Sequence, residues 1–202
     1  MKNKILFVLS VPEQAKKFWD IEEYKNIIQT VGQYELEDLN FEKYKAIIFS
    51  MYIDQHLLSS LENKLKSFLR KDKKILFNGH IIKPFFKELK TFIPTPRPTL
   101  EEFKIVQLKK HPIYKDINID ILNARKGVAG FFSRGTNPPP KEAKQFMAIK
   151  FSEVIVDWEY ELNEGILYVH SGNDLWTCME KEEGNILLFR NIINWILGEE
   201  NE

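Results

Sequence analysis

Three almost unbroken apolar runs divide the first half of the chain, and polar or amphipathic segments lie between them. The runs cover residues 4–9, 44–50 and 74–78. A short, continuous apolar run is typical of a parallel strand that is buried on both faces. We therefore expect three buried parallel strands in this half.

The segments between these runs are predicted to be helical. Apolar side chains recur at near-helical spacing over residues 13–31, and a glycine then stops the helix. Residues 54–70 form a clear amphipathic pattern, whose stripe is Leu57, Leu58, Leu61, Leu65, Phe68 and Leu69. A further helix is expected from about residue 83 to 89, where a proline suits the first turn. Residues 34–39 predict a weaker edge strand.

This order of strands and helices predicts an α/β fold with a mostly parallel sheet and helices on both faces. The length of 202 residues suits a single domain that spans residues 1–202. The segment at about 92–157 breaks the alternation with prolines and strand-like stretches, and we interpret it as an irregular, antiparallel insertion on the same core. A strand at 165–170 and a well-buried helix at 185–197 complete the fold.

Composition and charge remove several classes of function. Lys and Arg together number 29, and Asp and Glu together also number 29, so the formal net charge is zero. This balance gives no support to a nucleic-acid partner. The single cysteine, Cys178, excludes an internal disulfide and a cysteine zinc cluster, and it favours a reducing, cytoplasmic setting. The first apolar run is too short for a signal peptide, and no run approaches the roughly 18 residues of a membrane span. No membrane partner is expected.

The candidate site residues follow the predicted strands. In open parallel sheets ligands bind beyond the carboxyl ends of the strands, and residues 78–80 and 170–174 stand at such ends. His170 is a candidate general acid or base, because imidazole titrates near neutrality, with Asp174 as its partner. The alternative is a buried histidine that bonds a neighbouring loop. Asn173 and Asp174 suit contacts to sugar hydroxyls, and equally a turn and a helix cap.

Asn78, Gly79 and His80 have two readings as well. A glycine that lets the backbone approach closely, at the start of a helix, suits a pocket for an anionic oxygen. The alternative is a simple strand–helix turn. Arg134 follows a segment rich in glycine and phenylalanine, so it is either the anion-reading residue of a lid or part of a packed surface loop.

Two stretches carry a resemblance to known proteins. Lys45-Ala-Ile-Ile-Phe-Ser50, a helix, and then Lys74-Ile-Leu-Phe-Asn-Gly-His80 resemble the flavodoxin-like fold of the class I glutamine amidotransferase-like superfamily. Gly165-Ile-Leu-Tyr-Val-His-Ser-Gly-Asn-Asp174, with Asn191-Ile-Ile-Asn-Trp195 and His111-Pro-Ile113, is similar to trehalose-utilisation (ThuA-like) proteins. The resemblance implies a pocket for a small, carbohydrate-related molecule.

The departures from the superfamily exclude its best-known chemistry. A glutaminase needs a cysteine at the strand–helix elbow, a histidine after a late strand, and an acid two residues beyond that histidine. His170 fits the histidine's place, but Asn78 stands near the nucleophile's place and Gly172 stands where the acid belongs. Cys178 matches no elbow. Glutaminase activity is therefore not expected.

Three hypotheses follow from the sequence. The first is a non-glutaminase domain that binds a small molecule through Asn78, Gly79, His80 and Asn173. The second is a sugar-directed hydrolase or isomerase that uses His170 and Asp174. The third is a catalytically silent protein-interaction module. Two histidines and Asp174 lack the spacing of a metal motif, so neither a metal nor another cofactor is expected. The oligomeric state, a homo-oligomer included, is left open.

Overall fold

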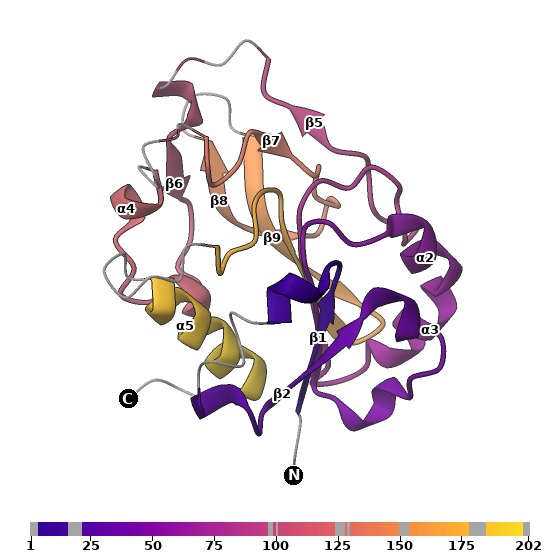
Figure 1. Cartoon of the computed structure of the whole chain (residues 1–202). Helices are drawn as coiled ribbons and strands as arrows, with labels where there is room; N and C mark the ends of the chain where they lie inside the picture. Colours follow the sequence, from indigo (N-terminus) through magenta and orange to yellow (C-terminus); the bar gives the residue numbers. More distant parts are fainter. Residues whose placement is uncertain are drawn as a thin grey trace.

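The computed structural model describes residues 4–15, 22–96, 99, 101–123, 128, 130–149, 154–177 and 185–199. Within these residues the chain forms an eight-stranded sheet in the order β2-β1-β3-β4-β10-β9-β8-β6, and a two-stranded ribbon, β5-β7 (Figure 1). Neighbouring strands are parallel from β2 through to β10 and antiparallel from β10 to β6. The predicted α/β, mostly parallel and flavodoxin-like fold is confirmed.

The predicted buried runs form the centre of the parallel half. The strands there are β1 (Ile5–Leu9), β3 (Ala46–Phe49), β4 (Lys74–Asn78) and β10 (Gly165–His170). Every residue of β1 and β3 is buried, as expected for strands covered on both faces. The hydrophobic runs of the sequence therefore identify the strands correctly.

The helix predicted over residues 13–31 is wrong where the structure describes it. Two 3₁₀ turns, η1 (Pro12–Ala15) and η2 (Glu22–Tyr24), precede an edge strand, β2 (Ile28–Gly32). Residues 16–21 lie outside the described residues. The β-branched side chains of β2 favour a strand, and pairing with β1 overrides the helical spacing. The edge strand predicted at residues 34–39 is wrong as well, because η3 (Gln33–Glu35) and a turn occupy this stretch.

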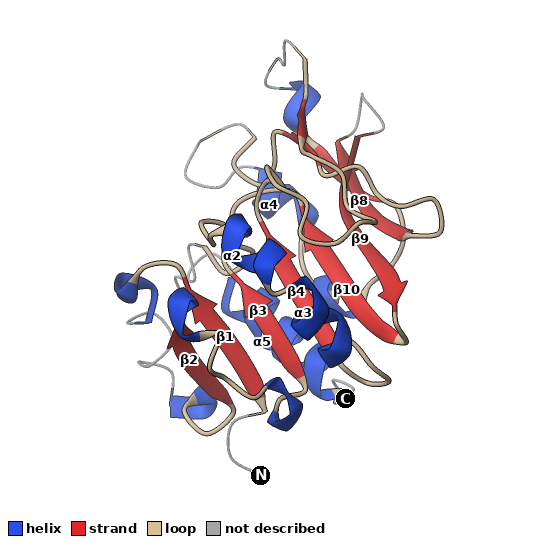
Figure 2. Ribbon diagram, turned by 90° about the vertical axis from the view of Figure 1, so that its right-hand side faces the viewer, coloured by secondary structure: helices blue, strands red, loops and turns tan. Residues whose placement is uncertain are grey.

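The helices cover both faces of the sheet (Figure 2). The predicted helix at 54–70 is present as two pieces, α2 (Gln55–Ser60) and α3 (Glu62–Phe68), and Asp54 caps the first by accepting from two backbone N–H groups. The last helix, α5 (Asn185–Leu197), has the predicted bounds. The helix predicted at about 83–89 is wrong, because this segment forms bends that bury Phe85 and Phe86. No described helix is long and apolar enough to cross a membrane.

Alternation along the strands divides the core into two layers. Ile5 and Phe7 of β1 pack in the cluster that contains α5, whereas Leu6 and Val8 pack in the cluster with α2 and α3. Successive side chains of a strand point to opposite faces, so each strand contributes to both layers. The sheet is thus enclosed between α5 on one face and α2–α3 on the other.

The segment after β4 supplies most of the antiparallel part of the sheet. Its strands are β6 (Ile105–Gln107), β8 (Lys144–Ile149) and β9 (Val154–Leu162), and they extend the sheet beyond β10. The short element η5 (Glu101–Phe103) precedes β6, and η6 (Pro112–Tyr114) and α4 (Ile119–Asn123) lie between β6 and β8. A small ribbon of β5 (Ile93–Pro94) and β7 (Gly135–Thr136) lies outside the main sheet, and η4 (Phe41–Lys43) precedes β3.

Candidate functional site

The carboxyl ends of β4 and β10 lie side by side. Asn78 is the register partner of His170, and the backbone N–H of Gly79 donates to the carbonyl of His170 at 3.0 Å. Parallel pairing therefore brings residues 78–80 and 170–174 to one edge of the sheet, although they are far apart in the sequence.

His170 forms a buried pair with an acid from the antiparallel half. Its Nδ1 lies 2.5 Å from Oδ1 of Asp157, and both side chains are fully buried. Asp157 is the register partner of His170 on β9, and side chains directly opposite each other point to the same face. Because a carboxylate only accepts, we assign the Nδ1 proton to the histidine. The acid that orients His170 is thus Asp157, and not Asp174 as the sequence suggested.

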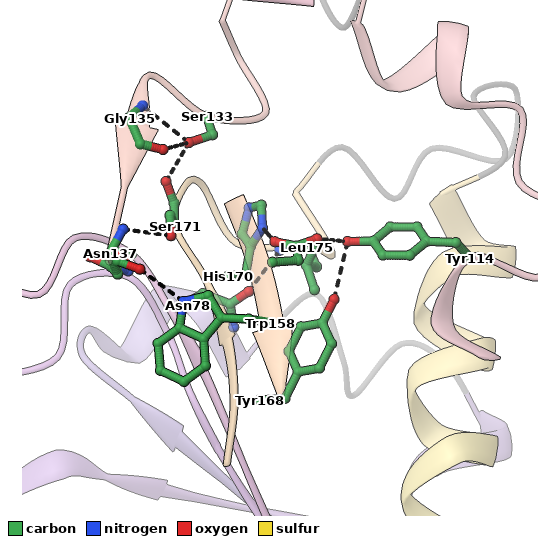
Figure 3. Close-up of polar contacts among 12 residues, drawn as sticks. Asn78, Tyr114, Ser133, Gly135, Asn137, Trp158, Tyr168, His170, Ser171 and Leu175 are labelled. Carbon is green, nitrogen blue, oxygen red and sulfur yellow. Dashed lines mark hydrogen bonds and ion pairs between the residues drawn. The ribbon is translucent and has the colours of Figure 1, made fainter. Parts of the chain in front are cut away.

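Two tyrosines continue this pair into a buried polar chain (Figure 3). The hydroxyl of Tyr114, from η6, donates to Oδ2 of Asp157, and the hydroxyl of Tyr168 lies 3.3 Å from that of Tyr114. Burial and the neighbouring Asp157 carboxylate raise the pKa of Tyr168 well above its usual value, so this hydroxyl keeps its proton. Asp157 therefore receives a donor at each of its oxygens.

The far side of the His170 ring is closed. Among the described residues, Nε2 has no hydrogen-bond partner. The ring of Phe132 stands edge-on to the imidazole, with centroids 4.5 Å apart. A methyl group at Gly172 would lie 2.9 Å from Nε2 and 1.8 Å from the carbonyl oxygen of Phe132, so only a glycine fits there. His170 is consequently sealed from solvent in this structure.

The loop that closes over His170 is fixed by polar contacts to the end of β10. Ser133 and Gly172 form an antiparallel bridge, and Oγ of Ser133 lies 2.5 Å from the carbonyl oxygen of Ser171. The backbone N–H of Asn137 donates to Oγ of Ser171 at 2.9 Å, while its side chain donates to the carbonyl of Gly79 at 2.8 Å. Residues 131–137 are thus bound to both strand ends.

Asn78 and Asp174 hold the neighbouring loops together. The side chain of Asn78 is fully buried, donates to the carbonyl of Phe49 at 3.0 Å and accepts from the N–H of Leu175 at 3.2 Å. Oδ1 of Asp174 accepts from the N–H of Met51 at 2.7 Å. Both side chains connect the ends of β3, β4 and β10, which is an architectural role.

A cavity of ≈ 200 Å³ opens at this edge of the sheet. Two of the predicted ligand-binding residues, His80 and Asn173, line it, together with Met51, Val128, Gly130, Phe131, Ser133, Arg134 and Gly172. The described lining does not include Asn78, Gly79, His170 or Asp174. Of the six residues predicted for the site, the fold brings all to one edge but directs only two into the cavity. We call this space the His80 cavity.

Aromatic rings support two of the residues around the His80 cavity. The ring of His80 stacks on Phe92, with centroids 3.7 Å apart and planes inclined by 14°. Burial, and to a smaller extent the nearby His170, lower the pKa of His80, so its imidazole is neutral at pH 7. The guanidinium carbon of Arg134 lies 5.6 Å from the ring centre of Phe103.

A second histidine–acid pair lies further along β9. Nε2 of His111 is 2.9 Å from Oε1 of Glu159, and its Nδ1 accepts from the N–H of Ile113 as the cap of η6. A cavity of ≈ 770 Å³ lies beside this pair, and its lining includes His111, Tyr114 and Trp195. The described residues contain no group of three histidine, cysteine or acidic side chains that could hold a metal ion.

Sequence comparisons identify no relative of the chain. No protein-family model matches it, and no curated protein matches it either. The structure, in contrast, is similar to several solved structures.

Three solved structures illustrate this likeness. The cytoplasmic protein STM1381 of Salmonella typhimurium LT2 is 12% identical with a TM-score of 0.58, over 95% of this chain and 98% of that one. The cytoplasmic protein STM3548 of Salmonella typhimurium is 10% identical with a TM-score of 0.54, over 95% and 98%. The cold-adapted β-galactosidase of Rahnella sp. R3 is 8% identical with a TM-score of 0.51, and all of this chain covers 32% of it. At such identities the likeness establishes a shared fold alone.

Proposed function

We propose that this chain is a non-glutaminase member of the class I glutamine amidotransferase-like superfamily, nearest to the trehalose-utilisation (ThuA-like) proteins, that binds a small, carbohydrate-related molecule. The observation that carries this proposal is the His80 cavity, which lies at the carboxyl ends of β4 and β10. Open α/β sheets bind their ligands at this edge. The volume of ≈ 200 Å³ lies below the roughly 300–1,000 Å³ of pockets for drug-sized ligands, so the cavity suits only a small ligand.

The lining of the cavity supports a ligand with many hydroxyl groups. His80 and Asn173 offer polar atoms, while Met51 and Phe131 offer apolar surface. A sugar needs both, because its ring presents hydroxyls at the edge and C–H groups on its faces. The sugar class itself comes from the resemblance to ThuA-like proteins, and one structural neighbour is a β-galactosidase.

The elbow argues against amide hydrolysis. Asn78 occupies the end of β4, where the nucleophile of a glutaminase belongs, and both ends of its amide are bonded within the fold. A carboxamide is not a nucleophile of the required strength.

We also infer a cytoplasmic setting from the single cysteine, and two neighbours are described as cytoplasmic proteins.

A sugar-directed hydrolase or isomerase is the second candidate. The 2.5 Å pair of His170 and Asp157 favours it, because a carboxylate that holds the Nδ1 proton leaves Nε2 ready to accept another. For His170 to act as a general base, the ring of Phe132 and the backbone at Gly172 must move away from Nε2, because they cover this atom.

Ligand titrations followed by two-dimensional NMR test the binding proposal. We expect a monosaccharide or disaccharide from a panel to shift the backbone signals of Phe131 and Asn173. The variant His80→Ala should weaken that binding at least tenfold, about the effect of one lost hydrogen bond. His56→Ala is the matched control, because His56 is exposed on α2. The proposal fails if no sugar binds, or if the two variants bind equally.

A further inference from the structure

We propose that the His80 cavity recognises an anionic group of its ligand, a carboxylate or a phosphate, and that Arg134 is the residue that pairs with it. This inference rests on the proposed function, because it concerns the same cavity. It narrows the ligand from any small sugar to an acidic one, such as a sugar acid or a sugar phosphate.

The charge of the lining is the first argument. Arg134 is the charged side chain among the described lining residues, and none of those residues is acidic. A guanidinium presents a planar fork of N–H donors that matches the oxygens of a carboxylate or phosphate. The imidazole of His80 is neutral at pH 7, so the positive charge in this lining belongs to Arg134.

Two acids of the described chain, Asp174 and Asp157, lie near the carboxyl end of β10 and have partners within the fold. Asp174 follows the lining residue Asn173, and its Oδ1 accepts from the backbone N–H of Met51 at 2.7 Å. Asp157 receives donors from His170 and Tyr114. Both carboxylates thus have hydrogen-bond partners within the fold.

The position of Arg134 is defined by its surroundings. Its guanidinium lies over the ring of Phe103, and its carbonyl accepts from the N–H of Thr95 at 2.9 Å. Gly130 has a φ of 65°, and a methyl group there would lie 3.0 Å from Cγ of Arg134 and 2.8 Å from the Phe103 ring. A glycine at this position therefore leaves room for the arginine to cross the lining.

His80 gives the cavity a second supported donor. The stacking on Phe92 restrains its ring, and a neutral imidazole carries one N–H. A positively charged fork and a neutral donor, each restrained by an aromatic ring, form a partly pre-organised site. Pre-organisation reduces the entropy that is lost when a ligand binds.

Calorimetry with one neutral sugar and two acidic derivatives tests the inference. The probes are glucose, gluconate and glucose 6-phosphate, titrated into the full chain at one ionic strength. We expect gluconate, glucose 6-phosphate or both to bind at least tenfold more tightly than glucose. R134Q should abolish that preference, and R134K should retain part of it, because lysine keeps the charge but lacks the fork. R70Q is the control, since Arg70 is exposed near the amino end of β4, away from the cavity.

The outcomes separate the inference from the proposed function. If glucose binds as tightly as both acids, or if R134Q leaves the preference unchanged, the inference is overturned and the binding of a neutral sugar stands. If none of the three sugars binds, nor any member of the wider panel, both fail. A preference for gluconate over glucose 6-phosphate, or the reverse, supports the inference and identifies the anion.

Discussion

Asp157 and His170 face each other across the β9–β10 pair, with Oδ1 and Nδ1 2.5 Å apart and neither side chain exposed. Two residues further along β9, Glu159 pairs with His111. The short element η6 contributes to both pairs, because His111 caps it and Tyr114 ends it. A single short element, η6, thus contacts two acids that are two residues apart on β9 and lie on the same face of that strand.

Removing one partner of the buried His170–Asp157 pair should lower the free energy of unfolding strongly. Replacing His170 with Ala leaves a buried carboxylate without its main partner, so we expect a loss of about 3–5 kcal/mol in the free energy of unfolding. Asp157→Asn should also destabilise the protein. Urea unfolding of both single variants and the double variant gives the coupling, which should exceed about 1 kcal/mol. Additive effects would show that the two side chains do not interact.

The hydroxyl of Tyr114 should stabilise the same carboxylate. Tyr114→Phe removes a donor to Asp157 without changing the packing of the ring, and we expect a loss of about 1.5–3 kcal/mol, the range for hydrogen bonds to charged groups. Tyr52→Phe is a matched control, because Tyr52 is 69% exposed. Equal effects of the two substitutions in urea unfolding would rule out this role for Tyr114.

Gly172 should tolerate no side chain. In Gly172→Ala the new methyl group collides with the backbone carbonyl of Phe132, which forms part of the closing loop. We expect a loss of more than about 2 kcal/mol and a change in the histidine NMR signals of His170. Gly32→Ala is the control, because its methyl group meets the flexible end of Glu35 and can be accommodated. A Gly172→Ala protein with unchanged stability would mean that the loop is loosely held.

His80 should make the protein less stable in mild acid. The pKa of His80 is lowered from its usual 6.5 by burial, so the unfolded chain binds a proton more readily than the folded one. Stability is therefore retained above pH 6.5 and decreases as the pH falls below it. His80→Gln should flatten this decrease when melting temperatures are measured between pH 7.5 and 5. An identical pH profile for wild type and His80→Gln would refute this prediction. The variant His56→Gln is the control, and its pH profile should match that of the wild type.

The pattern of apolar residues is sufficient to predict those elements whose own side chains decide their structure. The continuous apolar runs of β1, β3 and β4 have no other stable environment than a covered sheet, and α5 shows its helical stripe over its full length. The strand β2 was missed because its spacing also suits a helix. Only the neighbouring β1 decides between the two structures.

Part of the candidate site can likewise be predicted from the sequence, and part of it cannot. The edge that gathers residues 78–80 and 170–174 follows from parallel topology, which the sequence predicts. Asp157 does not follow from it, because it lies on a strand whose register with β10 depends on the turn at residues 163–164. Those turn residues, Asn163 and Glu164, both adopt positive φ angles, a conformation that is uncommon away from glycine.

The location of Asp157 limits how the fold can be divided. A minimal protein that kept only the five parallel strands and their helices would retain His170 but lose the acid that holds it. It would also lose Tyr114, and Trp195 of α5 would lose its contact with His111. The antiparallel strands are therefore not a detachable addition for protein engineering, since they supply the hydrogen-bond partner of a histidine that is buried in the parallel core.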